Sequence, residues 1–446
     1  MGAAVARLSN LHDGEEAIPD VVRWGDLAVP ALETLLRGPS QSVPHSRCWA
    51  ANALSAIGSA AANDALLRAL QDVSGRTLPA QLEEAETVVL GRIAEHLSAV
   101  PGEPVSVALL DTLRIHRSSP SCVRAVGSRR EMRSVLLLAD CLFEDSSRNA
   151  AVAALAGFGA DAVPYLCRAA LPPAAGEQME PPTHIEGRRA AVSALGHWLS
   201  DAPGDRDSRT TGVREALVAA LYDPQRSVRV GAAIALSRVP GDSASVITHI
   251  LVSALAETPW QQLESVMDAI ESLGLRAEAP LCAVIGARPG AGSDGERRIR
   301  AVTLAGRIGA VGAVPVLASL SSASDERLRL EAIRALARMP SEETGVLLPY
   351  LRDSSDSVRR TAFSGLHRRQ ALSLARIVES LSDRDARIRR LARVLLHRRG
   401  REALPILIHA VRSAGDGARG LVSRLRLCRE ALALIIAIKI RSQRCL

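Results

Sequence analysis

The pattern Arg-x-x-Ala-x-x-x-Leu recurs along the chain and constrains its fold more than any other feature. Its three fixed positions lie on one face of an α-helix with 3.6 residues per turn. Eight copies begin at Arg47, Arg148, Arg188, Arg229, Arg298, Arg329, Arg359 and Arg389, the fifth with Ala305 at the Leu position. The last four begin 30 or 31 residues apart. Because a fixed period of about 20–50 residues marks stacked repeats, the sequence predicts an all-α solenoid of about 11–12 antiparallel helix pairs.

A second helix is expected after most copies, because an apolar segment with Pro near its start follows the first helix. Pro is tolerated in the first turn of a helix, where the amide has no intrahelical partner. The four clearest starts are Val29-Pro30, Val163-Pro164, Val314-Pro315 and Leu404-Pro405. Turn residues separate the paired helices at Gly58, Gly159, Pro240, Gly309 and Pro340.

An Asp stands six residues before the Arg in three copies, at Asp223, Asp353 and Asp383. Together with the small residues after the Leu and the Val-Pro-x-Leu helix start, this pattern resembles bacterial HEAT repeats related to the phycobilisome-lyase-like HEAT repeats. The resemblance covers about residues 25–412 and implies a HEAT-like superhelix. It also implies that each repeated Arg bonds the turn Asp of its own or the adjacent unit. It says little about activity, because such repeats serve many functions.

The repeats are uneven. Glu83 and Val266 take the Arg position in two units, and residues 100–130 fit the pattern poorly. Three segments rich in Pro, Gly or Asp are predicted to be surface loops: 171–187, 200–212 and 288–295. We therefore expect an irregular N-terminal solenoid over residues 1–295, and regular basic repeats with a terminal capping helix over residues 296–446.

The charge is distributed asymmetrically. Residues 289–446 hold 30 Lys and Arg against 15 Asp and Glu, whereas the rest of the chain holds 25 against 33. A basic stripe of this kind is expected for a surface that binds phosphate groups or an acidic protein. Candidate binding residues are Arg360, Arg368, Arg369, Arg390, Arg393, Arg398 and Arg399. The alternative is a solvated helical face in an arginine-rich chain.

The repeated arginines themselves have two interpretations. They could form a row of donors for an acidic ligand, or a structural ladder that ties neighbouring units together. The Asp at position −6 favours the structural ladder, formed by Arg47, Arg148, Arg188, Arg229, Arg298, Arg329, Arg359 and Arg389.

The triplets 367–369 and 397–399, each His-Arg-Arg, also have two interpretations. They could form a shared anion site, but cations at a helix C-terminus also complement the helix dipole, and we favour that reading.

Few signals of catalysis are present. The sequence contains no H-E-x-x-H, Walker A, G-x-S-x-G or dinucleotide-binding motif. His184, His197 and Trp198 stand near the predicted loops without a matching nucleophile or carboxylate spacing. The seven cysteines are isolated, which argues against zinc and disulfides, so no metal or cofactor is expected. The first residues lack a signal-peptide core, and the apolar segment 431–438 is too short to span a membrane, so a cytoplasmic location is expected.

The sequence thus predicts a non-enzymatic interaction scaffold or adaptor that binds a protein partner on a concave face formed by the Arg-bearing helices. The alternative is a nucleic-acid-binding solenoid that uses the basic C-terminal third. Bilin-lyase-like activity, suggested by the family resemblance, and a chaperone role are minor alternatives. No membrane association or small-molecule substrate is expected. A final apolar helix over residues 419–440 either caps the last repeat or docks a partner, with capping favoured because solenoid ends need protection.

Overall fold

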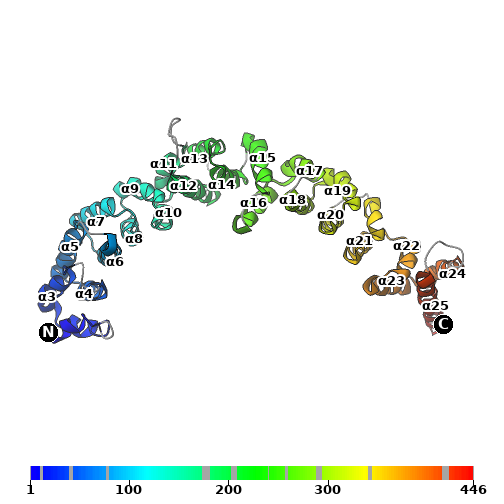
Figure 1. Cartoon of the computed structure of the whole chain (residues 1–446), viewed down its shortest axis with the longest axis horizontal. Coiled ribbons are helices and arrows are strands. Elements are labelled where there is room, and N and C mark those ends of the chain that lie inside the picture. The colour runs from blue at the N-terminus through cyan, green and yellow to red at the C-terminus, as the bar shows by residue number, and fades with distance from the viewer. Residues whose placement is uncertain are drawn as a thin grey trace. The chain divides into compact units, whose positions relative to one another are not determined.

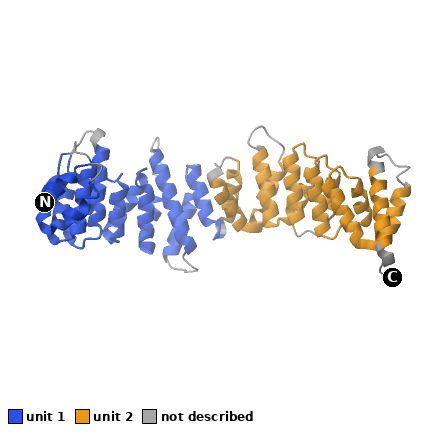
Figure 2. Cartoon of the chain, turned by 90° about the horizontal axis from the view of Figure 1, so that it is seen from below, with its two compact units in different colours: residues 1–243 blue, residues 244–446 orange. Residues whose placement is uncertain are grey.

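The computed structural model describes residues 2–10, 14–39, 44–76, 80–172, 181–201, 208–239, 241–256, 260–287, 294–339, 344–413 and 421–444. Over these ranges the regular structure consists of α-helices and short 3-10 helices, without a strand. The predicted all-α fold is therefore confirmed. The chain forms two compact units, unit 1 (residues 1–243) and unit 2 (residues 244–446), shown in blue and orange in Figure 2.

Unit 1 contains fourteen α-helices among its described residues. They are α1 (Gly2–Arg7), α2 (Ile18–Val22), α3 (Val29–Leu36), α4 (Pro44–Ile57), α5 (Ala60–Ser74), α6 (Ala80–Leu97), α7 (Glu103–Ile115), α8 (Pro120–Ser128), α9 (Val135–Asp140), α10 (Arg148–Ala156), α11 (Val163–Ala169), α12 (Pro182–Asp201), α13 (Ser208–Ala220) and α14 (Arg226–Leu236). The 3-10 helices are η1 (Gly25–Ala28), η2 (Met132–Ser134), η3 (Cys141–Phe143), η4 (Gly159–Ala162) and η5 (Gly241–Ser243).

Unit 2 contains eleven α-helices in its described part. They are α15 (Ala244–Ala254), α16 (Trp260–Leu273), α17 (Glu278–Gly286), α18 (Asp294–Ile308), α19 (Val314–Ser319), α20 (Glu326–Arg338), α21 (Asp356–Arg368), α22 (Leu374–Glu379), α23 (Ala386–Arg399), α24 (Leu404–Ser413) and α25 (Leu421–Arg444). The 3-10 helices are η6 (Gly274–Ala277), η7 (Val311–Ala313), η8 (Leu320–Ser322), η9 (Thr344–Leu347), η10 (Pro349–Arg352), η11 (Ser380–Ser382) and η12 (Gly400–Ala403).

Each unit has two layers of helices, as Figure 1 shows for the successive labels. We call the layer that carries the repeated arginines the arginine layer. In unit 1 it comprises α4, α6, α8, α10, α12 and α14, each in contact with the next. In unit 2 it comprises α16, α18, α20, α21, α23 and α25, which likewise pack in succession. Apart from α2, which packs on α4, the remaining α-helices form the second layer, and the 3-10 helices η9 and η10 take its place between α20 and α21. Most structural units are therefore helix pairs, as the period predicts.

The turn between the two layers has a recurring physical basis. Gly25, Gly159, Gly274 and Gly400 each adopt φ between 53° and 57° as the first residue of a 3-10 helix. This left-handed region is accessible to Gly without a steric penalty. The next helix then begins with Pro in its first turn at α3, α11 and α19, as expected. The fourth predicted start also holds, because α24 begins at Leu404.

Small residues allow the helices of the arginine layer to pack closely. A Cβ added at Gly306 of α18 would lie 2.7 Å from both the Cα and the Cβ of Ala335 in α20. One added at Gly365 of α21 would lie 2.9 Å from the Cβ of Ala337. Such distances leave no room for a methyl group. The low aromatic content of 2% is therefore compatible with a tight core built from Ala, Leu and Val.

Several local expectations differ from the structure. Residues 100–130 fit the repeat pattern poorly but form the ordinary helix pair α7 and α8. All three predicted loops are shorter than expected, because α12 begins at Pro182, α13 at Ser208 and α18 at Asp294. Of the segments predicted to be loops, residues 173–180, 202–207 and 288–293 lie outside the described residues, as do the turn residues Pro240 and Pro340. Contacts between residues divide the chain between residues 243 and 244. The boundary expected at residues 295–296 concerns repeat regularity and charge, and it stays a prediction.

The final helix packs onto the last repeat through one face. Leu427, Ala431, Leu434 and Ile438 of α25 are buried in a cluster with residues of α22, α23 and α24. This spacing of four, three and four residues forms one helical stripe. The opposite face exposes Leu432, Ile436 and Ile440 by 48%, 57% and 47%.

Candidate binding surface of the arginine layer

Two repeated arginines of unit 2, Arg329 and Arg359, link consecutive units of the arginine layer. Arg329 donates from Nε and Nη2 to the two carboxylate oxygens of Asp353, at 2.7 and 3.0 Å. Arg359 contacts Asp383 in the same way, with both distances 3.0 Å. The Nη1 group of each arginine donates to two backbone carbonyls, five and six residues earlier, at 2.8–3.1 Å. Each guanidinium therefore joins its own turn to the next unit.

The same arrangement occurs in parts of unit 1. Arg188 donates to both oxygens of Asp223 at 3.0 and 3.3 Å, and both residues are buried. Arg47 donates to both oxygens of Glu86 at 2.6 and 2.9 Å and also to the Leu36 carbonyl. A carboxylate held bidentately by a guanidinium forms a strong, geometrically specific contact.

The other four ladder arginines mainly bond groups close to them in the sequence, and Arg148 also donates to the Thr183 carbonyl at 3.4 Å. Arg229 and Arg389 bond the carbonyls five and six residues earlier, at 2.7–2.8 Å. Arg148 contacts the Leu142 carbonyl and Asp145, and Arg298 contacts the Ile285 carbonyl at 2.7 Å. The structural role of the whole ladder stays a proposal, supported by these contacts.

Electrostatics favours the charged form of two carboxylates in the arginine layer, Asp353 and Asp385. Burial raises the pKa of Asp353, but hydrogen bonds from Arg329 and from the Ser355 amide outweigh burial, so the pKa lies below its ordinary value. The same competition, with the Arg387 amide and Arg360 as donors, lowers the pKa of Asp385. These acids stay ionised and neutralise the arginines beside them. A ladder Arg that is matched in this way has little remaining capacity for an external anion.

Four of the seven candidate binding arginines have intramolecular partners. Arg360 donates to Asp385 at 2.8 Å, while Arg393 and Arg399 lie 3.5 and 3.8 Å from Glu430 and Glu402. Arg369 donates through Nη2 to the carbonyls of Leu336 and Met339, at the end of α20. Arg369 therefore caps the helix of the preceding unit, a contact that the sequence did not predict.

The remaining three candidates are exposed. Arg368, Arg390 and Arg398 have no hydrogen bond or ion pair to any described residue. Arg368 and Arg398 lie nine residues after the ladder residues Arg359 and Arg389, in the last turns of α21 and α23. The adjacent His367 is exposed at the end of α21, whereas His397 is half-buried at the end of α23.

An arginine also follows the ladder position by nine residues in the two preceding units. We call Arg307, Arg338, Arg368 and Arg398 the outer arginine column of unit 2. Arg307 lies 2.6 Å from Glu271, so its charge is matched. Arg338 is exposed and, like Arg368 and Arg398, has no partner in the described part of the chain. The sequence alone could have revealed this column through its 30-residue spacing, but Arg307 and Arg338 were not among the expected binding residues.

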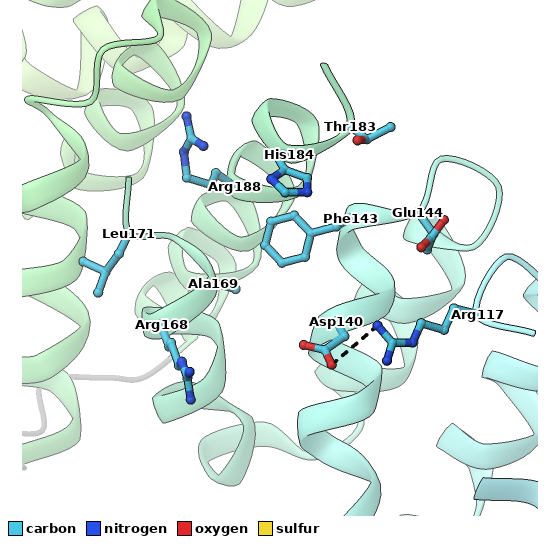
Figure 3. Close-up of a pocket in the computed structure, with 10 residues that line it drawn as sticks. All are labelled: Arg117, Asp140, Phe143, Glu144, Arg168, Ala169, Leu171, Thr183, His184 and Arg188. Atoms are coloured by element: carbon cyan, nitrogen blue, oxygen red, sulfur yellow. Dashed lines mark ion pairs between the residues drawn. The ribbon is translucent and has the colours of Figure 1, made fainter. Parts of the chain in front are cut away.

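Unit 1 contains a charged cavity of about 480 Å³, shown in Figure 3. Arg117 and Asp140 lie 4.0 Å apart in its wall, and the rings of Phe143 and His184 meet edge to face with centroids 5.4 Å apart. His184 makes no side-chain hydrogen bond to any described residue, so no base–carboxylate or nucleophile–base pair is present there. The side chain of His197, another candidate, forms a hydrogen bond with the Ser193 carbonyl of its own helix at 2.8 Å, and it has no other hydrogen bond to a described residue.

Other features constrain the chemistry. Among the described residues, no three His, Cys, Asp or Glu side chains come together as a metal site would require. Burial raises the pKa of the Cys122 and Cys141 thiols to about 11 and about 12, so both stay protonated near neutral pH. No helix in the described ranges combines the length and apolarity needed to cross a bilayer.

Comparison with known proteins identifies the repeats. Residues 290–366 match the family model for HEAT repeats, which confirms the predicted repeat type over this part of the chain. The bacterial, phycobilisome-lyase-like part of the resemblance stays a prediction. No curated protein sequence matches the chain.

Two solved structures are similar over most of the chain. The crystal structure of Kap121p bound to RanGTP has a TM-score of 0.45 and 12% identity, over 99% of this chain and 53% of that one. The crystal structure of Kap121p has a TM-score of 0.37 and 14% identity, over 98% and 52%. The chain thus spans about half the length of these proteins.

Proposed function

We propose that this chain, with HEAT repeats over residues 290–366, is a non-enzymatic scaffold that binds an acidic protein segment on the arginine layer of unit 2. The observation that carries the proposal is the outer arginine column. Arg338, Arg368 and Arg398 occupy equivalent positions in consecutive repeats and have no internal partner among the described residues. The concave curvature predicted for this face belongs to the proposal as well.

The spacing of the column supports an extended acidic segment as the ligand. Packed helices lie about 8–10 Å apart, so equivalent arginines in successive units recur at about that distance. A peptide in the polyproline II conformation rises about 3.1 Å per residue with three residues per turn, so carboxylates at every third residue lie on one face and would match the column. Arg390 lies on the same helix as Arg398 and adds a fourth unmatched charge.

The surroundings of the column favour a protein over a nucleic acid. Val394 of α23 is 41% exposed between Arg390 and Arg398, and arginines mixed with apolar side chains are typical of protein interfaces. Single-strand binding commonly relies on stacking of bases on aromatic side chains. Tyr350 and Phe363, the aromatic residues of the basic repeats, are both 1% exposed and cannot provide such a platform. The experiment must therefore distinguish binding of a duplex nucleic acid from binding of an acidic peptide.

The test is charge reversal of the column. A variant with Arg338→Glu, Arg368→Glu and Arg398→Glu should bind a fluorescent deca-glutamate peptide about tenfold more weakly, because each exposed ion pair contributes about 0.2–1 kcal/mol. The matched control is Arg352→Glu, Arg384→Glu and Arg412→Glu, which changes the charge equally at exposed positions outside the column. It should retain affinity within about twofold, with circular dichroism verifying both folds.

Two results would contradict the proposal. Equal losses in the column and control variants would show that only net charge matters. Tighter binding of duplex DNA than of the peptide, with the same dependence on the column and a steep loss with salt, would favour the nucleic-acid alternative. Capture of a cellular partner with and without nuclease would then show which class is bound in the cell.

A further inference from the structure

The arginine ladder of unit 2 lacks one carboxylate. Arg329 and Arg359 each pair with an Asp 24 residues later, in the turn before the next ladder helix. Those acids, Asp353 and Asp383, lie six residues before the next repeated Arg. The equivalent position before Arg329 is Ala323. Arg298, the ladder residue of the preceding unit, therefore has no carboxylate at the position where its successors have one.

A cavity of about 630 Å³ occupies this location. Arg298 and Ala323 both line it, together with Arg297. Its apolar wall includes Val252 of α15, Val284 of α17 and Leu328 of α20. All of these elements belong to unit 2. The size is within the range of about 300–1,000 Å³ that is typical of sites for small organic ligands.

The two arginines at the cavity have unused hydrogen-bonding capacity. Arg298 donates from Nε to the Ile285 carbonyl at 2.7 Å, and its terminal nitrogens have no partner among the described residues. The Nε of Arg297 is buried, also without a partner in the described part of the chain. A buried donor without an acceptor destabilises the protein relative to a paired one. An acceptor that enters the cavity would recover this energy.

The other polar groups of the cavity leave its charge positive. His249 lies in the wall, and Asp325 is the one carboxylate among the lining residues. Asp325 is already used at the start of α20, where its Oδ1 accepts the Arg327 amide at 2.8 Å. The serine residues 319, 322 and 324 along one edge provide neutral hydroxyl groups. The cavity thus combines an unmatched guanidinium with an apolar wall.

We propose that this cavity binds a carboxylate carried on a short apolar body. The carboxylate takes the place of the acid that Ala323 does not provide. It accepts from the two terminal nitrogens of Arg298, because the Nε of Arg298 already donates to the Ile285 carbonyl, whereas Asp353 accepts from Nε and Nη2 of Arg329. The planar guanidinium fork matches two carboxylate oxygens. The apolar body lies against Val252, Val284 and Leu328. The ligand would be a small organic acid or the C-terminal carboxylate of a peptide, which share this chemistry.

The substitution Ala323→Asp tests the proposal by restoring the missing link within the chain. Asp is native at the equivalent positions 353 and 383, where its Oδ1 also accepts the amide two residues later at 2.8 Å. We therefore expect the variant to fold and to melt about 2–4 °C higher than the wild type, because the added carboxylate pairs with Arg298. Ser354→Asp is the matched control, because it adds the same charge beside a link that is already complete.

The probes are butanoate, hexanoate, 1-hexanol and inorganic phosphate, tested on the full chain by thermal shift and calorimetry. Hexanoate should raise the melting temperature of the wild type and of Ser354→Asp more than butanoate does, and hexanol should not. Ala323→Asp should lose at least tenfold in hexanoate affinity. A pentapeptide ending in Leu, compared with its C-terminal amide, separates the two ligand sources. Tighter binding of the free-acid peptide than of hexanoate would assign the peptide terminus.

Three outcomes would overturn the proposal. Hexanol could stabilise as much as hexanoate, Ala323→Asp could respond like the wild type, or phosphate could bind more tightly than any carboxylate. If Ala323→Asp does not fold, Arg298→Gln serves instead and should also lose hexanoate binding. The site is independent of the proposed scaffold function, because reversing the outer arginine column should leave the hexanoate response unchanged.

Discussion

At the scale of single residues, the register within a helix decides what an arginine does. On α21, Arg359 is 7% exposed and contacts both its own turn and Asp383, whereas Arg368 on the same helix is exposed and unpaired among the described residues. A guanidinium whose N–H donors are paired within the protein contributes to the stability of the fold. A guanidinium exposed to solvent remains available to bind a partner. Chemical identity alone therefore does not distinguish the two roles.

The variant Arg359→Ala should destabilise unit 2. It leaves Asp383, whose side chain is 14% exposed, without its bidentate donor, and removing one partner of a buried pair costs about 3–5 kcal/mol. We expect the melting temperature to fall by about 5 °C or more. The control Arg368→Ala should stay within about 1 °C, because exposed substitutions have small effects. Unchanged stability with lost partner binding in Arg359→Ala would instead make the ladder a binding site.

Part of this residue-level chemistry could be predicted from the sequence. The Asp at position −6 predicted carboxylate partners for the ladder, and such contacts are present at Asp223, Asp353 and Asp383. The role of Arg369 could not be predicted, because its partners are backbone carbonyls of another unit. The sequence shows Ala323 at the position that Asp occupies in the next two units. Only the structure shows that a cavity lined by Arg298 lies there.

At the scale of elements, the apolar helix α25 buries only one stripe of its apolar surface. Its buried stripe, represented by Leu434, covers the last repeat, while Ile436 on the opposite face is 57% exposed. The sequence predicted an apolar terminal helix with two possible roles. It favoured the capping role, but it could not predict which residues are buried, because the apolar residues surround much of the helix and only tertiary contacts select the buried stripe.

Paired substitutions on α25 should separate its two faces. Leu434→Ala should lower the stability of unit 2 by about 2 kcal/mol, at the lower end for a buried Leu because Ala favours helix and a terminal helix can relax. Ile436→Ser should change stability by less than about 0.5 kcal/mol. Urea unfolding followed by circular dichroism measures both. A larger loss for Ile436→Ser than for Leu434→Ala would show that the exposed stripe is the one covered in solution.

At the scale of the whole molecule, contacts are local along the chain. Helices pack against neighbours one or a few places away, and the observed side-chain hydrogen bonds bridge up to 45 residues, as from Arg300 to the Leu255 carbonyl. The repeat period predicted this organisation. It did not predict the division between residues 243 and 244, because that division depends on how densely successive pairs pack rather than on composition.

Because the contacts are local, a substitution in the core should destabilise only the repeats near it. In a stacked-repeat protein, stability is roughly a sum of unit and neighbour terms. Phe363→Ala removes a side chain that is 1% exposed in the core of unit 2 and should cost about 3–5 kcal/mol. Hydrogen exchange measured by mass spectrometry should then accelerate in α20–α23 and stay unchanged in α4–α6.

The reciprocal variant makes the test specific. Leu54→Ala removes a fully buried side chain of α4 in unit 1 and should accelerate exchange in α4–α6 while leaving α20–α23 protected. If either substitution accelerates exchange equally in both regions, the two units unfold as a single cooperative block. The neighbour terms would then have to be strong enough to transmit the loss of one core side chain across the boundary at residue 243.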